Sequence, residues 1–194
     1  MADPQRRSVV HAGLTGRPGD VTGTGDLRDM LLSVGGASTR TRSGIDLTTA
    51  ATKLGVTRRT VERWLRGAGR SPEHNKALVR AARQTATTRA GRRAAMARVR
   101  SAISGAQSVR LSVSGNQGPV AQGTTYTRKR TTALHLSQQD AAAMLDAYER
   151  RGDAAFQDWA TQHWDRNYLD DWSFDSFDSV TIEISDGRTW RDWQ

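Results

Sequence analysis

The chain of 194 residues has no cysteine, and only 36% of its residues are hydrophobic. Without cysteine it can form no disulfide bond, thiolate metal site or cysteine nucleophile, which favours a reducing compartment. No apolar run reaches the length of a signal peptide or a membrane span. We therefore expect a soluble cytoplasmic protein without membrane contact, much of whose surface is solvated or faces a charged partner.

Motifs of the common catalytic classes are missing as well. The sequence has no Walker A, Rossmann or G-x-S-x-G motif. No carboxylate stands at metal-ligand spacing from any of the four histidines, which are His11, His74, His135 and His163. One acidic cluster lacks the glycine and terminal glutamate of an EF-hand loop, and it consists of Asp170, Asp171, Asp175 and Asp178. We interpret that cluster as an exposed turn, and we predict no metal site, no intrinsic cofactor and no self-sufficient enzyme.

Acidic residues are scarce over most of the chain. Residues 1–137 contain 24 Lys or Arg and 7 Asp or Glu, whereas residues 138–194 contain 5 and 13. The first part thus has a net charge of +17 and the second a net charge of −8, within a total of +9. A basic body is typical of proteins that face phosphates, and the acidic end suits a protein partner. Mutual attraction of the two ends is the alternative explanation.

Hydrophobic periodicity divides the chain into three parts. Residues 1–26 are rich in glycine, arginine and threonine without periodicity, so we expect a flexible basic tail. Residues 27–103 begin with apolar positions at helical spacing, and we expect a helical domain there. Residues 104–194 combine alternating runs with helical ones, which predicts a small α+β domain with a mainly antiparallel sheet. The predicted fold class is therefore α+β.

The sharpest local pattern is at residues 47–66. A short apolar helix face is followed by Gly55, which tolerates the positive φ of a tight corner between helices. Thr57 is a suitable N-cap for a second helix, whose buried face includes Val61 and Trp64. The pattern predicts a helix-turn-helix.

In a helix-turn-helix the second helix lies in the major groove of DNA. Arginine can bond to guanine, glutamate can accept a hydrogen bond from cytosine, and threonine can reach a phosphate. The outward residues that we expect to contact duplex DNA are Thr57, Arg58, Arg59, Glu62 and Arg63. An ordinary helical hairpin with a solvated basic face is the alternative.

The basic segment that follows contains no acid between residues 76 and 100, where eight residues are Lys or Arg. A solvated surface helix would carry acids among its bases. We therefore expect one or two helices, broken at Gly91, that contact phosphates and add affinity and salt dependence without reading sequence. The residues expected to make these contacts are Arg80, Arg83, Arg89, Arg92 and Arg93.

The period changes beyond residue 105. A first alternating run predicts a strand that ends at the glycine turns of residues 115–119, and a second run predicts a strand that ends at Leu136. Ser137 then caps a helix that closes at Gly152, a further helix follows, and residues 180–184 form a last strand. We expect the tryptophans to fill a core or a protein interface rather than to stack on bases; they are Trp64, Trp159, Trp164, Trp172, Trp190 and Trp193.

Residues 123–132 place hydroxyl groups beside the cations Arg128, Lys129 and Arg130. Such cations would attract the phosphates of a nucleoside triphosphate towards a neighbouring hydroxyl. A threonine-rich hairpin edge has the same composition, so this segment by itself leaves both interpretations open. The hydroxyl residues are Thr124, Thr125, Tyr126, Thr127 and Thr131.

The order of these features resembles the terminal proteins that cap the linear chromosomes and linear plasmids of Streptomyces and its relatives. The resemblance covers roughly residues 27–184, and its sharp motif, the helix-turn-helix, is shared with many repressors. Residues 38–44 and the tryptophan-rich tail after residue 186 depart from the family's pattern. The matching segments are R-D-M-L-L at 28–32, K-L-G-V-T-R-R-T-V-E-R-W-L-R-G at 53–67, the arginine-rich helix, G-T-T at 123–125, T-A-L-H-L-S at 132–137, the alanine-rich helix after it and the acidic closing strand.

Members of that family become covalently attached to the 5′ ends of DNA. A DNA polymerase transfers the first deoxynucleotide to a threonine hydroxyl, and the linked nucleotide primes end-patching synthesis. A telomere-associated accessory protein recruits them to the folded 3′ overhang. The resemblance implies Thr124 or Thr125 as the acceptor, with Tyr126 and Thr127 next in line. It also implies a nucleoid-associated protein whose partners are double-stranded or telomeric single-stranded DNA, the polymerase and the accessory protein.

Two other functions fit the same residues. The alternative is a helix-turn-helix transcriptional regulator, or a plasmid replication or partition factor, whose C-terminal domain forms a homodimer or binds an effector. A basic protein that binds RNA or coats the nucleoid is the third. Regulators of this type usually bind paired half-sites as dimers, whereas a monomer on a DNA end would favour priming.

Overall fold

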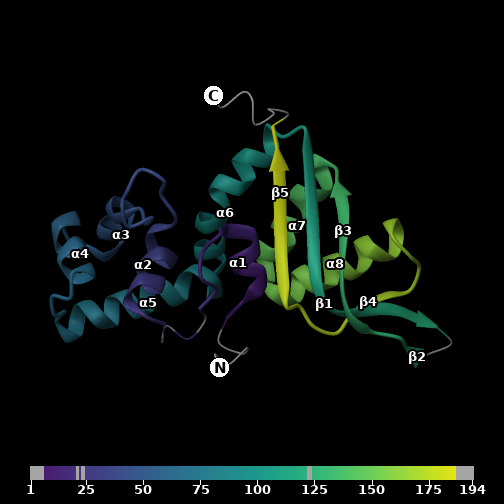
Figure 1. The fold of residues 1–194 in the computed structure, drawn as a ribbon, viewed down its shortest axis with the longest axis horizontal. Coiled ribbons are helices and arrows are strands. Elements are labelled where there is room, and N and C mark those ends of the chain that lie inside the picture. The colour runs from purple at the N-terminus through teal and green to yellow at the C-terminus, as the bar shows by residue number, and fades with distance from the viewer. Residues whose placement is uncertain (1–6, 21, 23–24, 122–123, 187–194) are drawn as a thin grey trace. The chain divides into compact units, whose positions relative to one another are not determined.

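The computed structural model describes residues 7–20, 22, 25–121 and 124–186. These residues form eight helices and an antiparallel sheet of five strands, which confirms the α+β class expected from the sequence (Figure 1). The chain divides into two compact units, residues 1–95 and 96–194, so the boundary lies inside helix α6 (Arg89–Ser104). Within the described ranges no helix combines the length and the apolar character needed to cross a membrane.

The first unit begins with a helix where the sequence pattern predicts a flexible tail. Helix α1 (Val9–Thr15) starts at the N-cap Ser8 and buries Val10, His11 and Leu14. The prediction is wrong for this segment because hydrogen bonds as well as apolar contacts fix it. For example, Arg17 donates to the carbonyl oxygen of Ser33 at 2.8 Å. The remainder of the predicted tail, residues 1–6, 21 and 23–24, lies outside the described residues.

Four helices form the core of the first unit: α2 (Leu27–Gly35), α3 (Leu47–Leu54), α4 (Arg58–Leu65) and α5 (Pro72–Thr87). Each begins at a side chain that accepts a hydrogen bond from a backbone N–H of the first turn, and these caps are Asp26, Asp46, Thr57 and Ser71. Helix α3 contacts the other three. The shared core includes Leu31, Val34, Ala50, Val61, Trp64 and Leu78.

The break in the basic segment occurs at Thr88, not at Gly91 as the sequence pattern predicts. Thr88 is extended and ends α5, and its hydroxyl accepts a hydrogen bond from the N–H of Gly91 in the first turn of α6. Gly91 has a different role. A Cβ atom there would lie 1.9 Å from the carbonyl oxygen of Gln84, so glycine allows α6 to pass close to the end of α5.

Strand β1 (Ser108–Ala121) is the centre of the sheet in the second unit (Figure 1). On one edge it pairs antiparallel with β2 (Thr124–Thr125) and β3 (Arg128–Leu136). It also pairs antiparallel with β4 (Trp172–Phe174) and β5 (Ser179–Ser185). The register of β1 with β2 is the same as with β3, so these strands form one hairpin interrupted at residues 126–127.

The glycines of β1 do not form the turns that their spacing predicts, because the strand continues through Gly115 and Gly118 to residue 121. Each lies beside an interruption in a neighbouring strand. A Cβ atom at Gly115 would lie 2.0 Å from the carbonyl oxygen of Ser176, and one at Gly118 would lie 2.2 Å from that of Tyr126. Glycine is therefore required here for close approach of another backbone, which the sequence pattern does not distinguish from a turn.

Helices α7 (Gln138–Arg151) and α8 (Asp153–Asn167) contact the sheet and each other. The capping of α7 by Ser137 and its end at Gly152 are confirmed. A buried polar chain joins this layer to the sheet. The Trp164 indole donates to the Thr132 hydroxyl at 2.9 Å, and this hydroxyl donates to Oε1 of Gln117 at 2.7 Å. The Gln117 amide nitrogen donates to the backbone carbonyls of Val113 and Arg130.

Candidate nucleic-acid interface

The corner between α3 and α4 is tight, and its backbone N–H groups have hydrogen-bond partners. Gly55 has a φ of 66°, as the sequence pattern predicts, and its N–H donates to the carbonyl oxygen of Ala51. Val56 donates to the same carbonyl at 3.0 Å. Thr57 then begins α4, and its hydroxyl accepts from the N–H of Thr60 at 3.1 Å. The direction of α4 is thus fixed by local backbone geometry as well as by its core.

Helix α4 has one anchored face and one exposed cationic face. Val61 and Trp64 are 0% and 4% exposed, which holds the helix against the core. Arg59 and Arg63 are exposed on the other side. Neither guanidinium forms a hydrogen bond or ion pair with any part of the chain that the structure describes. Arg66, which the sequence-based set omits, is exposed at the end of the same helix.

Arg58 and Glu62 are neighbours one helical turn apart and form an ion pair. Arg58 Nε lies 2.8 Å from Glu62 Oε1, and their side chains are 56% and 39% exposed. Exposed pairs of this spacing contribute only about 0.3–0.5 kcal/mol to stability. Their effect on the surface is larger, because the carboxylate of Glu62 is neutralised and the exposed face of α4 keeps a net positive charge.

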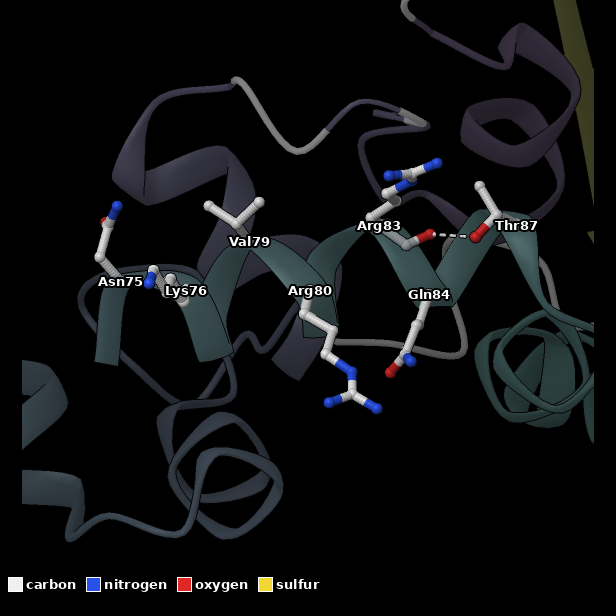
Figure 2. Close-up of a pocket in the computed structure, with 7 residues that line it drawn as sticks. All are labelled: Asn75, Lys76, Val79, Arg80, Arg83, Gln84 and Thr87. Carbon is white, nitrogen blue, oxygen red and sulfur yellow. Dashed lines mark hydrogen bonds between the residues drawn. The ribbon is translucent and has the colours of Figure 1, made fainter. Parts of the chain in front are cut away.

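Helix α5 carries a second cationic surface. A hollow of 470 Å³ lies along it, lined among others by Lys76, Arg80 and Arg83 (Figure 2). Arg80 and Arg83 point to opposite sides of the helix in this view. The Thr87 hydroxyl donates to the carbonyl oxygen of Arg83 at 3.0 Å, and no hydrogen bond or ion pair occupies the two guanidiniums within the described ranges.

The predicted contacts on α6 are not all at the surface. Arg89 and Arg93 are exposed, but Arg92 is 7% exposed and donates to the carbonyl oxygen of Ala86 at 3.0 Å. The prediction that Arg92 contacts DNA is therefore wrong in this structure, because its guanidinium supports the corner between α5 and α6. Farther along the helix, Arg100 is paired with acidic side chains of α7, Asp146 at 2.8 Å and Glu149 at 3.3 Å.

A further group of arginines, which the sequence pattern did not single out, lies near α4. Arg40 and Arg42 are exposed on the loop between α2 and α3. With Arg58, Arg66 and other residues they line a hollow of 460 Å³. In the sequence, two arginines within a run of serine and threonine could have indicated a cationic loop. Only the folded loop brings them close to α4.

The hydroxyl-rich segment lies at the end of the β1–β3 hairpin. Thr124 and Thr125 are exposed and pair with Ala121 and Val120 of β1. Gly123, the first residue of the G-T-T segment, lies outside the described residues. Tyr126 is 57% exposed, which makes it the most exposed large hydrophobic side chain among those described.

The cations and hydroxyls next to this tip are in different environments. The Thr127 hydroxyl donates to the carboxylate of Asp175, and Lys129 pairs with Asp178 at 2.9 Å. Arg130 is half-buried, with its guanidinium carbon 5.4 Å from the ring centroid of Trp172. Arg128 and Thr131 are exposed. The accessible hydroxyls of the tip are therefore those of Thr124, Thr125 and Tyr126. The Thr127 hydroxyl is already hydrogen-bonded to Asp175.

Some of the histidines and tryptophans lie in the cores of the two units. His11 and His163 are buried, whereas His74 and His135 are exposed. Burial, together with Arg17 and Arg92, lowers the pKa of His11 to about 4. The buried tryptophans are Trp64, Trp164 and Trp172. Trp190 and Trp193 lie outside the described residues.

The described residues thus present two kinds of exposed chemistry. Unpaired guanidinium groups lie on α4 and α5 of the first unit, and free hydroxyls lie at the hairpin tip of the second. Nowhere in the described ranges do three or more His, Asp or Glu side chains gather in a way that could hold a metal ion. No protein-family model, curated protein or solved structure matches this chain.

Proposed function

We propose that the chain binds duplex DNA through α3 and α4, which act as a helix-turn-helix with α4 in the major groove. The observation that carries the proposal is the two-sided character of α4. Val61 and Trp64 fix one side in the core, while Arg59 and Arg63 on the other side are exposed and unpaired within the described chain. Arginines on an anchored helix are suited to bidentate bonds with guanine.

The same proposal gives α5 and the start of α6 a supporting role. Lys76, Arg80 and Arg83 surround a hollow on α5, and Arg89 and Arg93 are exposed on α6. Cations of this kind bind phosphates, which supplies affinity without sequence specificity. Arg92 is not part of this set because it is buried.

Binding of labelled duplexes to the full chain tests the proposal. The double variant Arg59→Ala with Arg63→Ala should weaken the preferred duplex about tenfold or more, because each base-reading arginine is worth about 1–3 kcal/mol. The control is Arg110→Ala with Arg151→Ala, which removes the same charge from arginines paired with Glu183 and Asp158 in the other unit. Equal affinities of the two double variants would refute the role of α4.

A second function is favoured by the exposure of the hairpin tip. We propose that Thr124 or Thr125 accepts the first deoxynucleotide when a DNA polymerase patches the end of a linear replicon, as the resemblance to terminal proteins suggests. Both hydroxyls are exposed on the short strand β2, where another protein's active site can reach them. Thr127 is a weaker candidate because its hydroxyl is bonded to Asp175.

The chemistry of this step assigns the protein the role of a substrate. The threonine oxygen would attack the α-phosphorus of a deoxynucleoside triphosphate, a new P–O bond would form, and pyrophosphate would leave. The hydroxyl proton would pass to a base of the polymerase, whose metal ions would stabilise the transferred phosphoryl group. An alcohol without such help is a poor nucleophile.

Incubation with a cognate polymerase and a labelled deoxynucleoside triphosphate tests this second function. Label that survives denaturation should appear on the protein and disappear in Thr124→Ala with Thr125→Ala. Thr131→Ala is the matched control, because Thr131 is also exposed but lies on β3 away from the tip. Label retained in the tip variant would move the acceptor to Tyr126, and no label with any template would leave DNA binding alone.

The regulator alternative makes a different prediction about assembly. A transcriptional regulator or partition factor would bind paired half-sites as a dimer. Sedimentation of the chain on duplexes with free ends and on duplexes with both ends blocked distinguishes the cases. A monomer that requires a free DNA end supports priming, whereas a dimer on an internal site supports the regulator. The acidic part of the chain, residues 138–194, is the proposed contact for the polymerase or an accessory protein.

A further inference from the structure

The loop between α2 and α3 is held in shape by its own hydrogen bonds. Ser38 donates through its N–H to the carbonyl oxygen of Gly44 at 2.9 Å, and the Thr41 hydroxyl donates to that of Ile45 at 2.8 Å. Arg28 of α2 donates to the carbonyl oxygen of Ser43. Ile45 is 1% exposed and anchors the end of the loop in the core. Such a loop presents its side chains in a defined geometry.

The loop presents two arginines to a hollow that it shares with α4. Arg40 and Arg42 line the hollow from the loop, and Arg58 and Arg66 line it from the helix. The carboxylate that lines it, Glu62, is already paired with Arg58 at 2.8 Å. Arg40, Arg42 and Arg66 have no side-chain partner within the described ranges. The side chains that line the hollow therefore have a net charge of +3, and no unpaired carboxylate among them balances it.

The volume and lining of the hollow suit a phosphate-containing ligand. Its volume of 460 Å³ lies within the range of about 300–1,000 Å³ typical of small-molecule sites. Leu47 and Leu65 add apolar surface to the cationic lining. Guanidinium groups bind phosphate oxygens in bidentate geometry, and an apolar patch beside them can contact a sugar.

We infer that this hollow is a phosphate-binding site for a nucleotide unit. Two sources supply that chemistry: a backbone phosphate of DNA beside α4, or a free nucleotide. The first source rests on the proposed DNA binding by α4, because the strand flanking the occupied groove would pass the loop. The second does not depend on it. The loop thus acts as a clamp that adds phosphate contacts to the face of α4.

The duplex arm of the test measures affinity of the full chain at 50 mM and 200 mM salt. Each lost phosphate contact lowers the salt slope by about 0.9, so Arg40→Ala with Arg42→Ala should lower it by about 1.8. The loss of affinity between the two salt concentrations should then shrink about twelvefold, equally for all sequences. Arg110→Ala with Arg151→Ala is the charge-matched control, and thermal unfolding confirms that both variants are folded.

The phosphate arm uses inorganic pyrophosphate without DNA. Side-chain Nε–H signals of Arg40, Arg42 and Arg66 in NMR spectra should shift on titration, while that of Arg151 should not. A changed salt slope identifies the DNA backbone as the source, and pyrophosphate shifts without it identify a free nucleotide. If the salt slope does not change and pyrophosphate shifts none of these signals, the phosphate site is refuted. If the unaltered chain binds no duplex at all, the proposed function fails while the pyrophosphate titration still decides the hollow.

Discussion

Replacing Thr132 by valine should destabilise the second unit strongly although it changes hardly any volume. The Thr132 hydroxyl, which is buried, accepts from the Trp164 indole at 2.9 Å and donates to Oε1 of Gln117 at 2.7 Å. Valine has the same shape without the hydroxyl, so both partners would remain buried and unpaired. Gln117 and Trp164 are 0% exposed, which leaves water no access to replace the lost bonds.

The expected magnitude follows from the number of groups left unsatisfied. Each buried donor or acceptor without a partner costs about 1–3 kcal/mol, so the two together should cost about 2–6 kcal/mol. Domains are stable by only about 5–15 kcal/mol in total. Thr131→Val is the matched control, because Thr131 is exposed on the adjacent position of β3, where a substitution should change stability by less than about 0.5 kcal/mol.

Native-state hydrogen exchange measures this effect within the second unit. The amides of Leu111 and Val113 lie in the centre of β1 and should report its opening free energy, while urea unfolding gives the effect on the whole chain. The indole N–H signal of Trp164 should also move in Thr132→Val and stay in place in Thr131→Val. Equal costs for the two variants would refute the role of the buried polar chain.

Gly115→Ala should destabilise the chain by about 1–3 kcal/mol in urea unfolding, because its Cβ atom would lie 2.0 Å from the carbonyl oxygen of Ser176. Gly105→Ala, with nothing within 4 Å of its Cβ, should not, and equal costs would contradict the steric argument. Glu62→Gln should raise affinity for all duplexes in anisotropy titrations, and it should remove about 1–3 kcal/mol of discrimination if Glu62 reads cytosine; an equal gain for every sequence would exclude base reading. Because the pKa of His11 falls from 6.5 to about 4 on folding, the unfolded chain binds more protons between these values. The contribution of His11 to the free energy of unfolding should therefore be fully present above about pH 6.5. It should fall by about 2 kcal/mol between pH 7 and pH 5. Chemical unfolding across this range should show that His11→Leu loses this part of the slope, and an unchanged slope would rule His11 out as its source.

The helix caps and the α4 pattern were readable from local sequence. Thr57 and Ser137 accept the capping hydrogen bonds that their positions predict, and Gly55 has the positive φ that its corner requires. These features depend on a few consecutive residues, so the chain determines them without knowledge of distant contacts. The candidate DNA-contacting face of α4 follows from the same helical period.

Some residues fit two structural roles by sequence, and only their neighbours in the folded chain determine which role they have. By sequence, Gly115 and Gly118 fit a turn or the close approach of another backbone equally well. In the structure another backbone lies directly beside each of them, so close approach is their role. Arg92 fits the basic stripe of its helix, but the corner between α5 and α6 buries it. Helix α1 lacks a long periodic pattern, and Arg17, which follows the helix, is bonded to Ser33 of α2.

The sequence by itself determined the α+β class, the capped helix pair and the separation of basic and acidic parts. These are set by periodicity, capping chemistry and composition, which are local properties. The tertiary structure alone decided that Arg40 and Arg42 share a hollow with Arg58 and Arg66, and that Thr124 and Thr125 remain free while Thr127 is bonded. Burial and charge balance arise between segments distant in sequence, so only the folded chain fixes which of its cations and hydroxyls remain available.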